Sequence, residues 1–74
     1  MKQRKTVEDY LKAVYLLQKQ NGSVRGADIA AELHVSRPTV SVSLKELEKE
    51  GYLFLDSARE VHLTDKGKTV ARET

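Results

Sequence analysis

The chain has 74 residues, no cysteine and a formal net charge of +2, which allows one small domain and excludes disulfides, thiolate metal sites and cysteine nucleophiles. Its longest apolar runs, such as residues 14–17, are too short to cross a bilayer, and residues 1–5 lead into no apolar signal segment. We therefore expect a cytoplasmic protein. The sequence contains no nucleophile–base set and no phosphate-cradling glycine loop, so we do not expect an enzyme.

The first predicted element is a helix that runs to about Gln20. Thr6 and Asp9 resemble a capping box at its start, and Asn21 and Gly22 provide a C-terminal stop. Its apolar residues recur with helical spacing at Val7, Tyr10, Leu11, Val14 and Leu17.

Two further helices follow, with only a tight turn between them. The second begins near Gly26 or Ala27, and Ser36 is a good N-cap for the third, which covers residues 37–50 and stops at Gly51. The apolar face of the second helix is formed by Ile29, Ala30 and Leu33. The core face of the third is formed by Val40, Leu44 and Leu47.

The pattern after Gly51 changes to two short strands, 52–55 and 60–63, joined by a polar loop. A last helix has Thr64 as its N-cap and ends abruptly at Thr74, as a truncated helix does. Three helices followed by a hairpin predict a mostly α-helical fold with a small β-hairpin, the winged helix-turn-helix. The third helix is then the recognition helix, and residues 53–63 are the wing.

The start of the third helix breaks the usual rules of helix stability. Residues 36–43 are rich in serine, threonine and valine, each of which costs roughly 0.5 kcal/mol relative to alanine. Arg37 sits at the positive end of the helix dipole, while three glutamates crowd the negative end. Several unfavourable residues in one short segment indicate a functional role for it. The alternative is that the helix is simply weak at its start and that these residues have no function.

A helix of this kind suits the major groove of DNA, because its width of about 10–12 Å matches a groove of about 12 Å. Small hydroxyl side chains can bond phosphates or base edges, Pro38 and Val42 can meet thymine methyl groups, and the absence of acids avoids repelling phosphate. On this helix the expected DNA contacts are Ser36, Arg37, Pro38, Thr39, Ser41, Val42 and Lys45. We add Ala27, where the second helix offers free amides to a phosphate, and Arg59 near the tip of the wing.

Residues 28–30, 35–41, 47–53 and 63–67 together resemble the DNA-binding domain of the diphtheria-toxin-repressor family, the iron- and manganese-dependent repressors. The resemblance implies that Ser36 opens the recognition helix of a transcriptional repressor. It further implies double-stranded DNA with a palindromic operator as the partner, a homodimer in the full-length protein, and Fe²⁺ or Mn²⁺ as the effector. Several relatives carry a polar residue where this chain has Val42, so the operator sequence stays open.

The same resemblance makes Asp9 a candidate metal ligand. A neighbouring acidic ligand of the manganese-responsive branch falls at Lys12 here, and the remaining ligands belong to a second, metal-binding and dimerising domain that these residues lack. The capping-box role of Asp9 is an equally good explanation. His34 and His62 are isolated in the sequence, and we interpret them as surface or partly buried side chains rather than ligands.

Two alternatives to a metal-dependent repressor remain. Winged-helix regulators of the multiple-antibiotic-resistance type share the motifs at 47–51 and 63–67 and need no metal. A winged helix can also serve protein–protein contact, with Pro38 and Val42 facing the partner, and such a function predicts no dependence on phosphate.

Overall fold

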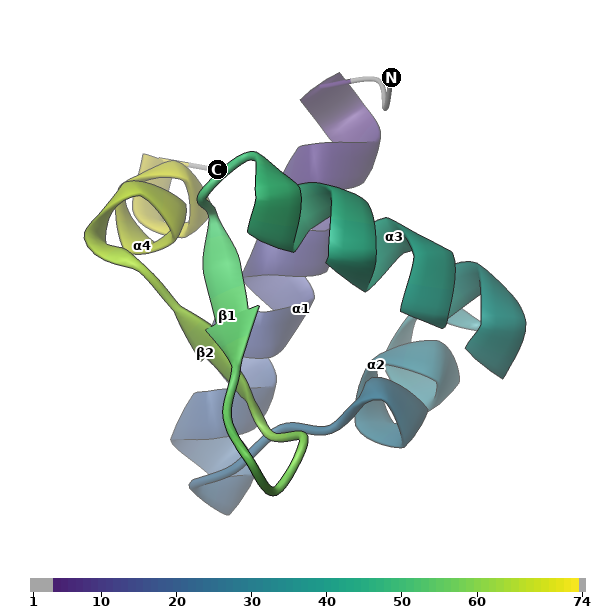
Figure 1. Ribbon diagram of the computed structural model, residues 1–74. Coiled ribbons are helices and arrows are strands. Elements are labelled where there is room, and N and C mark those ends of the chain that lie inside the picture. The colour runs from purple at the N-terminus through teal and green to yellow at the C-terminus, as the bar shows by residue number, and fades with distance from the viewer. Residues whose placement is uncertain (1–3, 74) are drawn as a thin grey trace.

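The computed structural model describes residues 4–73, and in this range it has four helices and one two-stranded antiparallel hairpin (Figure 1). The elements in chain order are α1 (Arg4–Asn21), α2 (Gly26–Leu33), α3 (Arg37–Lys49), β1 (Leu53–Leu55), β2 (Val61–Leu63) and α4 (Asp65–Glu73). This order confirms the winged helix-turn-helix, with α3 as the third helix and β1–β2 as the wing. None of the described helices has the length and apolar character that a membrane crossing requires.

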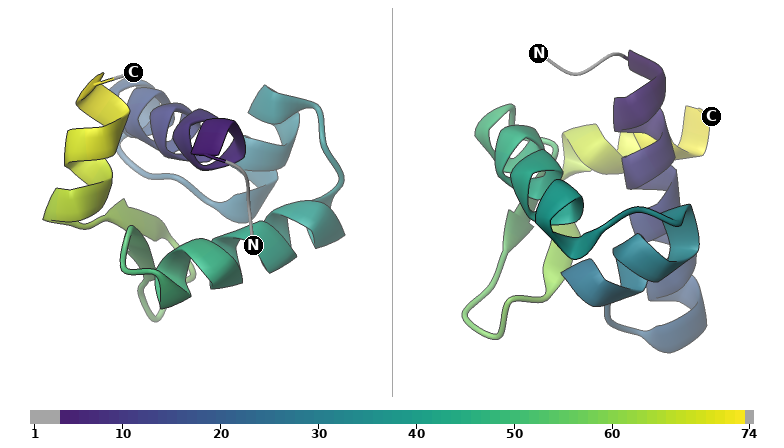
Figure 2. Two further views of the ribbon diagram at one scale, coloured as in Figure 1. Left: turned by 90° about the horizontal axis from the view of Figure 1, so that it is seen from above. Right: turned by 90° about the vertical axis from the view of Figure 1, so that its right-hand side faces the viewer.

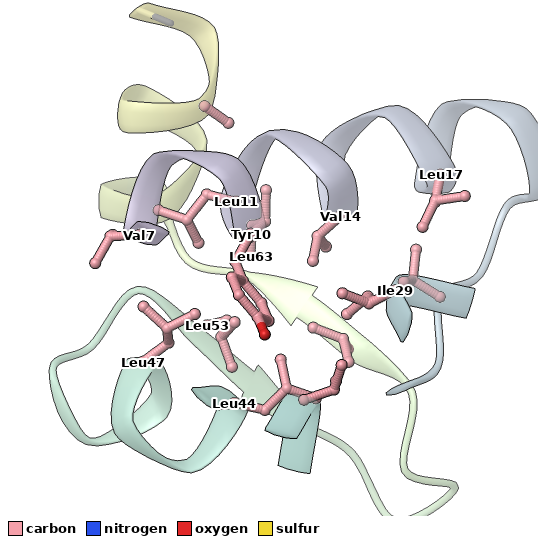
Figure 3. Packing of buried hydrophobic residues seen from close by; sticks show 14 of the residues in the cluster. Val7, Tyr10, Leu11, Val14, Leu17, Ile29, Leu44, Leu47, Leu53 and Leu63 are labelled. Carbon is pink, nitrogen blue, oxygen red and sulfur yellow. The ribbon is translucent and has the colours of Figure 1, made fainter. Parts of the chain in front are cut away.

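The core forms where α1 meets the other elements. α1 packs on α2, α4 and β2, while α3 packs on α2 and β1, so that one apolar cluster joins all six elements (Figures 2 and 3). The side chains that Figure 3 labels come from α1, α2, α3 and both strands, and they point toward one another. The helical spacing of apolar residues in α1 therefore predicted its buried face correctly: Val7, Tyr10, Leu11, Val14 and Leu17 are all buried.

The ends of the helices are set by local backbone and cap geometry. Gly22 and Gly51 both have positive φ angles, 80° and 84°, which glycine adopts without steric cost. The Ser36 hydroxyl accepts a hydrogen bond from the amide of Thr39 at 3.3 Å, as an N-cap does. These three predictions are confirmed. The turn between α2 and α3 depends on His34, which adopts the left-handed conformation at φ 57° without being a glycine.

The predicted capping box of α1 is wrong. α1 begins at Arg4, so Thr6 and Asp9 both lie within the helix rather than at its N-cap and third position. The remaining boundaries differ slightly: α3 ends at Lys49 with Glu50 as its C-cap, and each strand has three residues. A cap pattern read from sequence does not exclude one more helical turn before it, and this explains the error at Thr6.

Thr64 attaches α4 to the segment that follows α3. Its hydroxyl oxygen lies 2.7 Å from the carbonyl oxygen of Gly51 and 3.0 Å from that of Tyr52, and the same hydroxyl accepts a hydrogen bond from the amide of Gly67. Gly67 itself is buried against the Tyr52 carbonyl group. The sequence Leu-Thr-Asp-Lys-Gly thus has a structural purpose, which is to join α4 to the chain between α3 and the wing.

The segment between α1 and α2 also contacts the wing. Val24 is buried, and its carbonyl oxygen accepts a hydrogen bond from the amide of Val61 in β2 at 2.7 Å. The main chain just before α2 is thereby joined to the second strand of the hairpin.

Candidate nucleic-acid interface

A groove of about 460 Å³ runs between the start of α2, one flank of α3 and the loop of the wing. In Figure 1 the wing loop and α2 lie on the same side of α3. The positively charged residues that line the groove are Arg25, Arg37, Lys45 and Arg59, and the one acidic residue in the lining is Glu48. Four cations against one carboxylate give this groove the positive potential that a phosphate backbone requires.

The structure brings five of the nine residues predicted to contact DNA together around this groove. They are Ala27, Arg37, Ser41, Lys45 and Arg59. The other four lie on the exposed surface of α3 and its N-cap, outside the groove lining: Ser36, Pro38, Thr39 and Val42. All nine side chains are exposed, so each is accessible to a partner.

The start of α3 presents hydroxyl groups that are already partly engaged. The Ser36 and Thr39 hydroxyl oxygens lie 2.8 Å apart, within hydrogen-bond distance, in addition to the cap bond to the Thr39 amide. Ser36 therefore has the structural role that its position predicts. Ser41 lies on the exposed side one turn further along the helix, and none of the hydrogen bonds found in residues 4–73 engages its hydroxyl group.

Val42 is the most exposed large apolar side chain among the described residues, with 56% of its surface accessible. It sits on the side of α3 opposite the buried residues Val40, Leu44 and Leu47. Helix stability offers no reason for valine at an exposed position, because its branched side chain lowers helix propensity. Val42 is thus both apolar and exposed, as a contact with a thymine methyl group requires.

The wing loop is held by Asp56. One carboxylate oxygen, Oδ1, accepts hydrogen bonds from the amides of Ala58 at 2.9 Å and Glu60 at 3.0 Å. The other, Oδ2, lies 2.7 Å from Nε2 of His62, which acts as the donor because an ionised carboxylate only accepts. Arg59 then adopts a left-handed conformation with φ 64° at the tip of the loop. This rigid turn projects the Arg59 side chain into solvent beside the groove.

The hydrogen bond from His62 lowers the pKa of the Asp56 carboxyl group below its ordinary value of 3.8, and the bonds from the amides of Glu60 and Ala58 act in the same direction. Partial burial opposes this shift. The carboxylate is therefore favoured in its charged form, as the acceptor that the loop amides require.

Asp9 lies apart from this interface. It is exposed on α1, where Lys12 stands one turn further along and is also exposed. Within residues 4–73 no group of three metal-ligating side chains includes Asp9. The role of Asp9 as a metal ligand stays a prediction.

Sequence reasoning missed the surroundings of His62. Its ring is stacked on Phe54 with centroids 5.2 Å apart, and it contacts the carboxylate of Asp56. The pairing of Phe54 with His62 across the hairpin produces this arrangement. Only a correct strand register could have revealed it, because the residues are well separated along the chain.

The chain is similar in sequence to known transcriptional regulators. The family model described as iron dependent repressor, N-terminal DNA binding domain, matches residues 3–61. The HTH-type transcriptional regulator MntR of Bacillus subtilis is 34% identical over 67 residues, which are 90% of this chain and 47% of that protein. The regulator of the same name from Bacillus pumilus is also 34% identical over 67 residues, 90% of this chain and 46% of that protein.

Among solved structures, MepR, a transcription regulator of the Staphylococcus aureus multidrug efflux pump MepA, is similar with a TM-score of 0.67 and 28% identity. The match covers 89% of this chain and 52% of MepR. A MepR–DNA complex from S. aureus has a TM-score of 0.63 and 27% identity, over 89% of this chain and 50% of that one. The chain thus spans about half the length of the relatives that it matches.

Proposed function

Because the chain belongs to the family of iron-dependent repressor N-terminal DNA-binding domains, we propose that it binds double-stranded DNA sequence-specifically as the DNA-binding part of a metal-dependent transcriptional repressor. α3 enters the major groove with its N-terminal half, and the wing and the start of α2 contact the phosphate backbone beside it. The single observation that carries this proposal is the groove beside α3, which Arg25, Arg37, Lys45 and Arg59 line with positive charge.

We expect two kinds of contact with DNA. Arg37, Lys45, Arg59 and the amide of Ala27 neutralise or bind phosphates, which gives affinity without sequence preference. Ser41 and Val42 face the base edges, where the hydroxyl bonds a polar edge and the valine contacts a thymine methyl group. The apolar exposed position of Val42 supports a T·A pair at the matching place in the operator.

The partner is a palindromic operator, and two copies of this domain occupy it as a homodimer in the full-length protein. Helix-turn-helix proteins place two recognition helices about one turn of DNA apart, which requires a dimer. MepR, the solved relative with the same fold, has been crystallised with DNA, and this supports duplex DNA as the partner of the fold.

Metal dependence, with Fe²⁺ or Mn²⁺ as effector, rests on family membership. In that role Asp9 contributes one carboxylate, while Lys12 stands where the manganese-responsive branch has an acidic ligand. The family resemblance assigns the remaining ligands to a second, metal-binding and dimerising domain. When bound, such an ion supplies charge and orientation rather than chemistry. The domain itself binds and positions DNA and needs no catalytic group.

The experiment that tests this function is a ¹H–¹⁵N correlation-spectrum titration with a mixed-sequence DNA duplex at low salt. We expect shifts at residues 36–45, at Ala27 and around Arg59, and we expect them to fade as the salt concentration rises. The absence of shifts, or shifts at Thr39 and Val42 that are insensitive to salt, would instead favour a protein partner for this face.

A further inference from the structure

A second cluster of polar side chains lies on the wing, on the outward side of the hairpin. Asp56 follows β1, Glu60 precedes β2, and His62 lies within β2. One ligand atom from each side chain lies within 4.8 Å of the others, and Asp56 Oδ2 and His62 Nε2 are only 2.7 Å apart. Within residues 4–73 this is the one such group of three potential metal ligands.

The hairpin register explains why these three side chains meet. Leu55 pairs with Val61, so the next positions outward, 56 and 60, are opposite each other at the base of the loop. The amide of Asp56 donates to the carbonyl of Glu60 at 3.1 Å, which continues the ladder by one step. Side chains alternate between the two faces of a strand, so positions 56, 60 and 62 all lie on the face opposite Val61.

Hydrogen bonds and ring stacking already gather the ligand atoms before any ion binds. The two loop amides occupy Oδ1 of Asp56 and leave Oδ2 directed at His62. The stacked ring of Phe54 holds the imidazole from the other side. The side chains of His62 and Asp56 are still 33% and 35% exposed, so an ion can reach them from solution.

The charge of the cluster is unbalanced. Two carboxylates and one imidazole carry a net charge of −2 when the imidazole is neutral, and still −1 when it is protonated. In the described part of the chain, the carboxylate of Glu60 makes no ion pair or hydrogen bond, although it is partly buried beside a second carboxylate. Arg59, the cation of this loop, makes no ion pair with either carboxylate in residues 4–73, and a divalent cation would neutralise the charge.

We propose that Asp56, Glu60 and His62 form a binding site for a divalent transition-metal ion on the wing, separate from Asp9. The donor set of one imidazole nitrogen and two carboxylate oxygens suits Mn²⁺, Fe²⁺, Co²⁺ or Zn²⁺, whereas Mg²⁺ and Ca²⁺ prefer oxygen donors alone. The ion takes the place of the proton between Asp56 Oδ2 and His62 Nε2, and the neutral imidazole then carries its proton on Nδ1. Small rotations of these exposed side chains open the distance that two ligands of one ion need. Water completes the coordination shell. This site does not depend on the proposed function.

The first test is a titration of the 74-residue chain, freed of metal by a chelator, with Mn²⁺ while ¹H–¹⁵N spectra are recorded. Mn²⁺ is paramagnetic and broadens the signals nearest to it, so we expect the earliest losses at residues 54–62. Zn²⁺, which binds nitrogen and oxygen sites of this kind more tightly than Mn²⁺, should displace it and restore these signals. Broadening centred on residues 8–12, or spread evenly over all exposed carboxylates, would overturn the proposal.

The second test uses two variants and a control. Glu60→Gln removes a carboxylate that makes no hydrogen bond, and His62→Gln keeps a polar group opposite Asp56, so both variants should remain folded. Each should weaken Zn²⁺ binding, measured by calorimetry, by about tenfold or more. The control is Asp9→Asn, which removes a carboxylate on α1 and should leave the affinity of the wing site for Zn²⁺ unchanged. Equal Zn²⁺ affinity in wild type and Glu60→Gln, or no binding at millimolar Zn²⁺, would refute the site.

Discussion

The side-chain amine of Lys66 donates a hydrogen bond to the carbonyl oxygen of Glu50 at 2.9 Å. α4 thereby supplies a cation to the C-terminal end of α3, where Glu46, Glu48 and Glu50 crowd the negative end of the helix dipole. The same amine lies 4.3 Å from the centre of the Tyr52 ring. Lys66 therefore caps the C-terminal end of α3.

Replacing this cap should lower stability. We expect Lys66→Met to reduce the free energy of unfolding by about 0.5–1.5 kcal/mol, because the Glu50 carbonyl loses its donor and Tyr52 its cation. Lys68→Met, an exposed lysine of the same helix, is the control and should change stability by less than about 0.5 kcal/mol. Urea denaturation followed by circular dichroism measures both, and equal effects would show that Lys66 does not act as a cap.

Gly67 allows α4 to approach the chain after α3. A Cβ atom at this position would overlap the carbonyl oxygen of Tyr52, so we expect Gly67→Ala to destabilise the protein by about 1–3 kcal/mol. Gly26→Ala is the matched control, because its Cβ would meet Val40 at 3.7 Å and Leu44 at 3.9 Å, which are ordinary contacts. Thermal denaturation should separate the two variants, and a neutral Gly67→Ala would contradict the close approach.

Ser43 is buried in α3 with 1% of its surface exposed, and its hydroxyl oxygen has no hydrogen-bond partner in residues 4–73. An unsatisfied buried hydroxyl is costly, so Ser43→Ala should raise the free energy of unfolding by about 1 kcal/mol or more. Ser41→Ala gains only helix propensity, about 0.5 kcal/mol, and loses a proposed DNA contact. A chemical denaturation series on both variants tests this, and a less stable Ser43→Ala would point to a partner that the hydroxyl finds in solution.

The cations of the groove should set the salt dependence of DNA binding. If Lys45 and Arg59 each contact a phosphate, then replacing either by alanine lowers the slope of log K against log salt by about one. Fluorescence anisotropy with a labelled duplex at several salt concentrations measures this slope. Lys68→Ala, an exposed cation on α4 that does not line the groove, should leave the slope unchanged, and an equal drop for Lys68→Ala would mean that the attraction is not localised.

Asp56 should contribute to acid sensitivity. Its pKa in the folded chain lies below the ordinary value of 3.8, so the folded state favours the carboxylate. The resulting stability is present above pH 3.8 and is lost as the pH falls through the lower folded pKa. We expect the stability difference between wild type and Asp56→Asn to shrink between about pH 5 and pH 2, measured with chelator present. A difference that is constant with pH would contradict the shift.

Much of the fold was predictable because it depends on local patterns. The apolar spacing of α1, the serine cap of α3 and the glycines at 22 and 51 each act within a few residues of chain, and the structure bears them out. The exposed apolar position of Val42 also followed from helical geometry alone.

The parts that were not predictable depend on contacts between distant residues. Arg25 and Arg59 are far apart in the sequence and line the same groove because α2 and the wing both pack beside α3. The contact of His62 with Asp56 requires the register of the hairpin, and the bond from Lys66 to Glu50 requires the position of α4. His34 in the left-handed conformation is a different case, because no sequence rule places histidine where glycine is favoured.

The hydrogen bond between Val61 and Val24 has a consequence for the thermodynamics of binding. It joins the wing to Val24, the residue that immediately precedes Arg25 and Gly26, so a main-chain hydrogen bond connects two walls of the groove. A wing that became ordered only on contact would lose conformational entropy for each residue that it fixed, and this loss would weaken the complex. Here the wing is already ordered in the folded domain, so this entropy is lost during folding and not when the groove binds DNA.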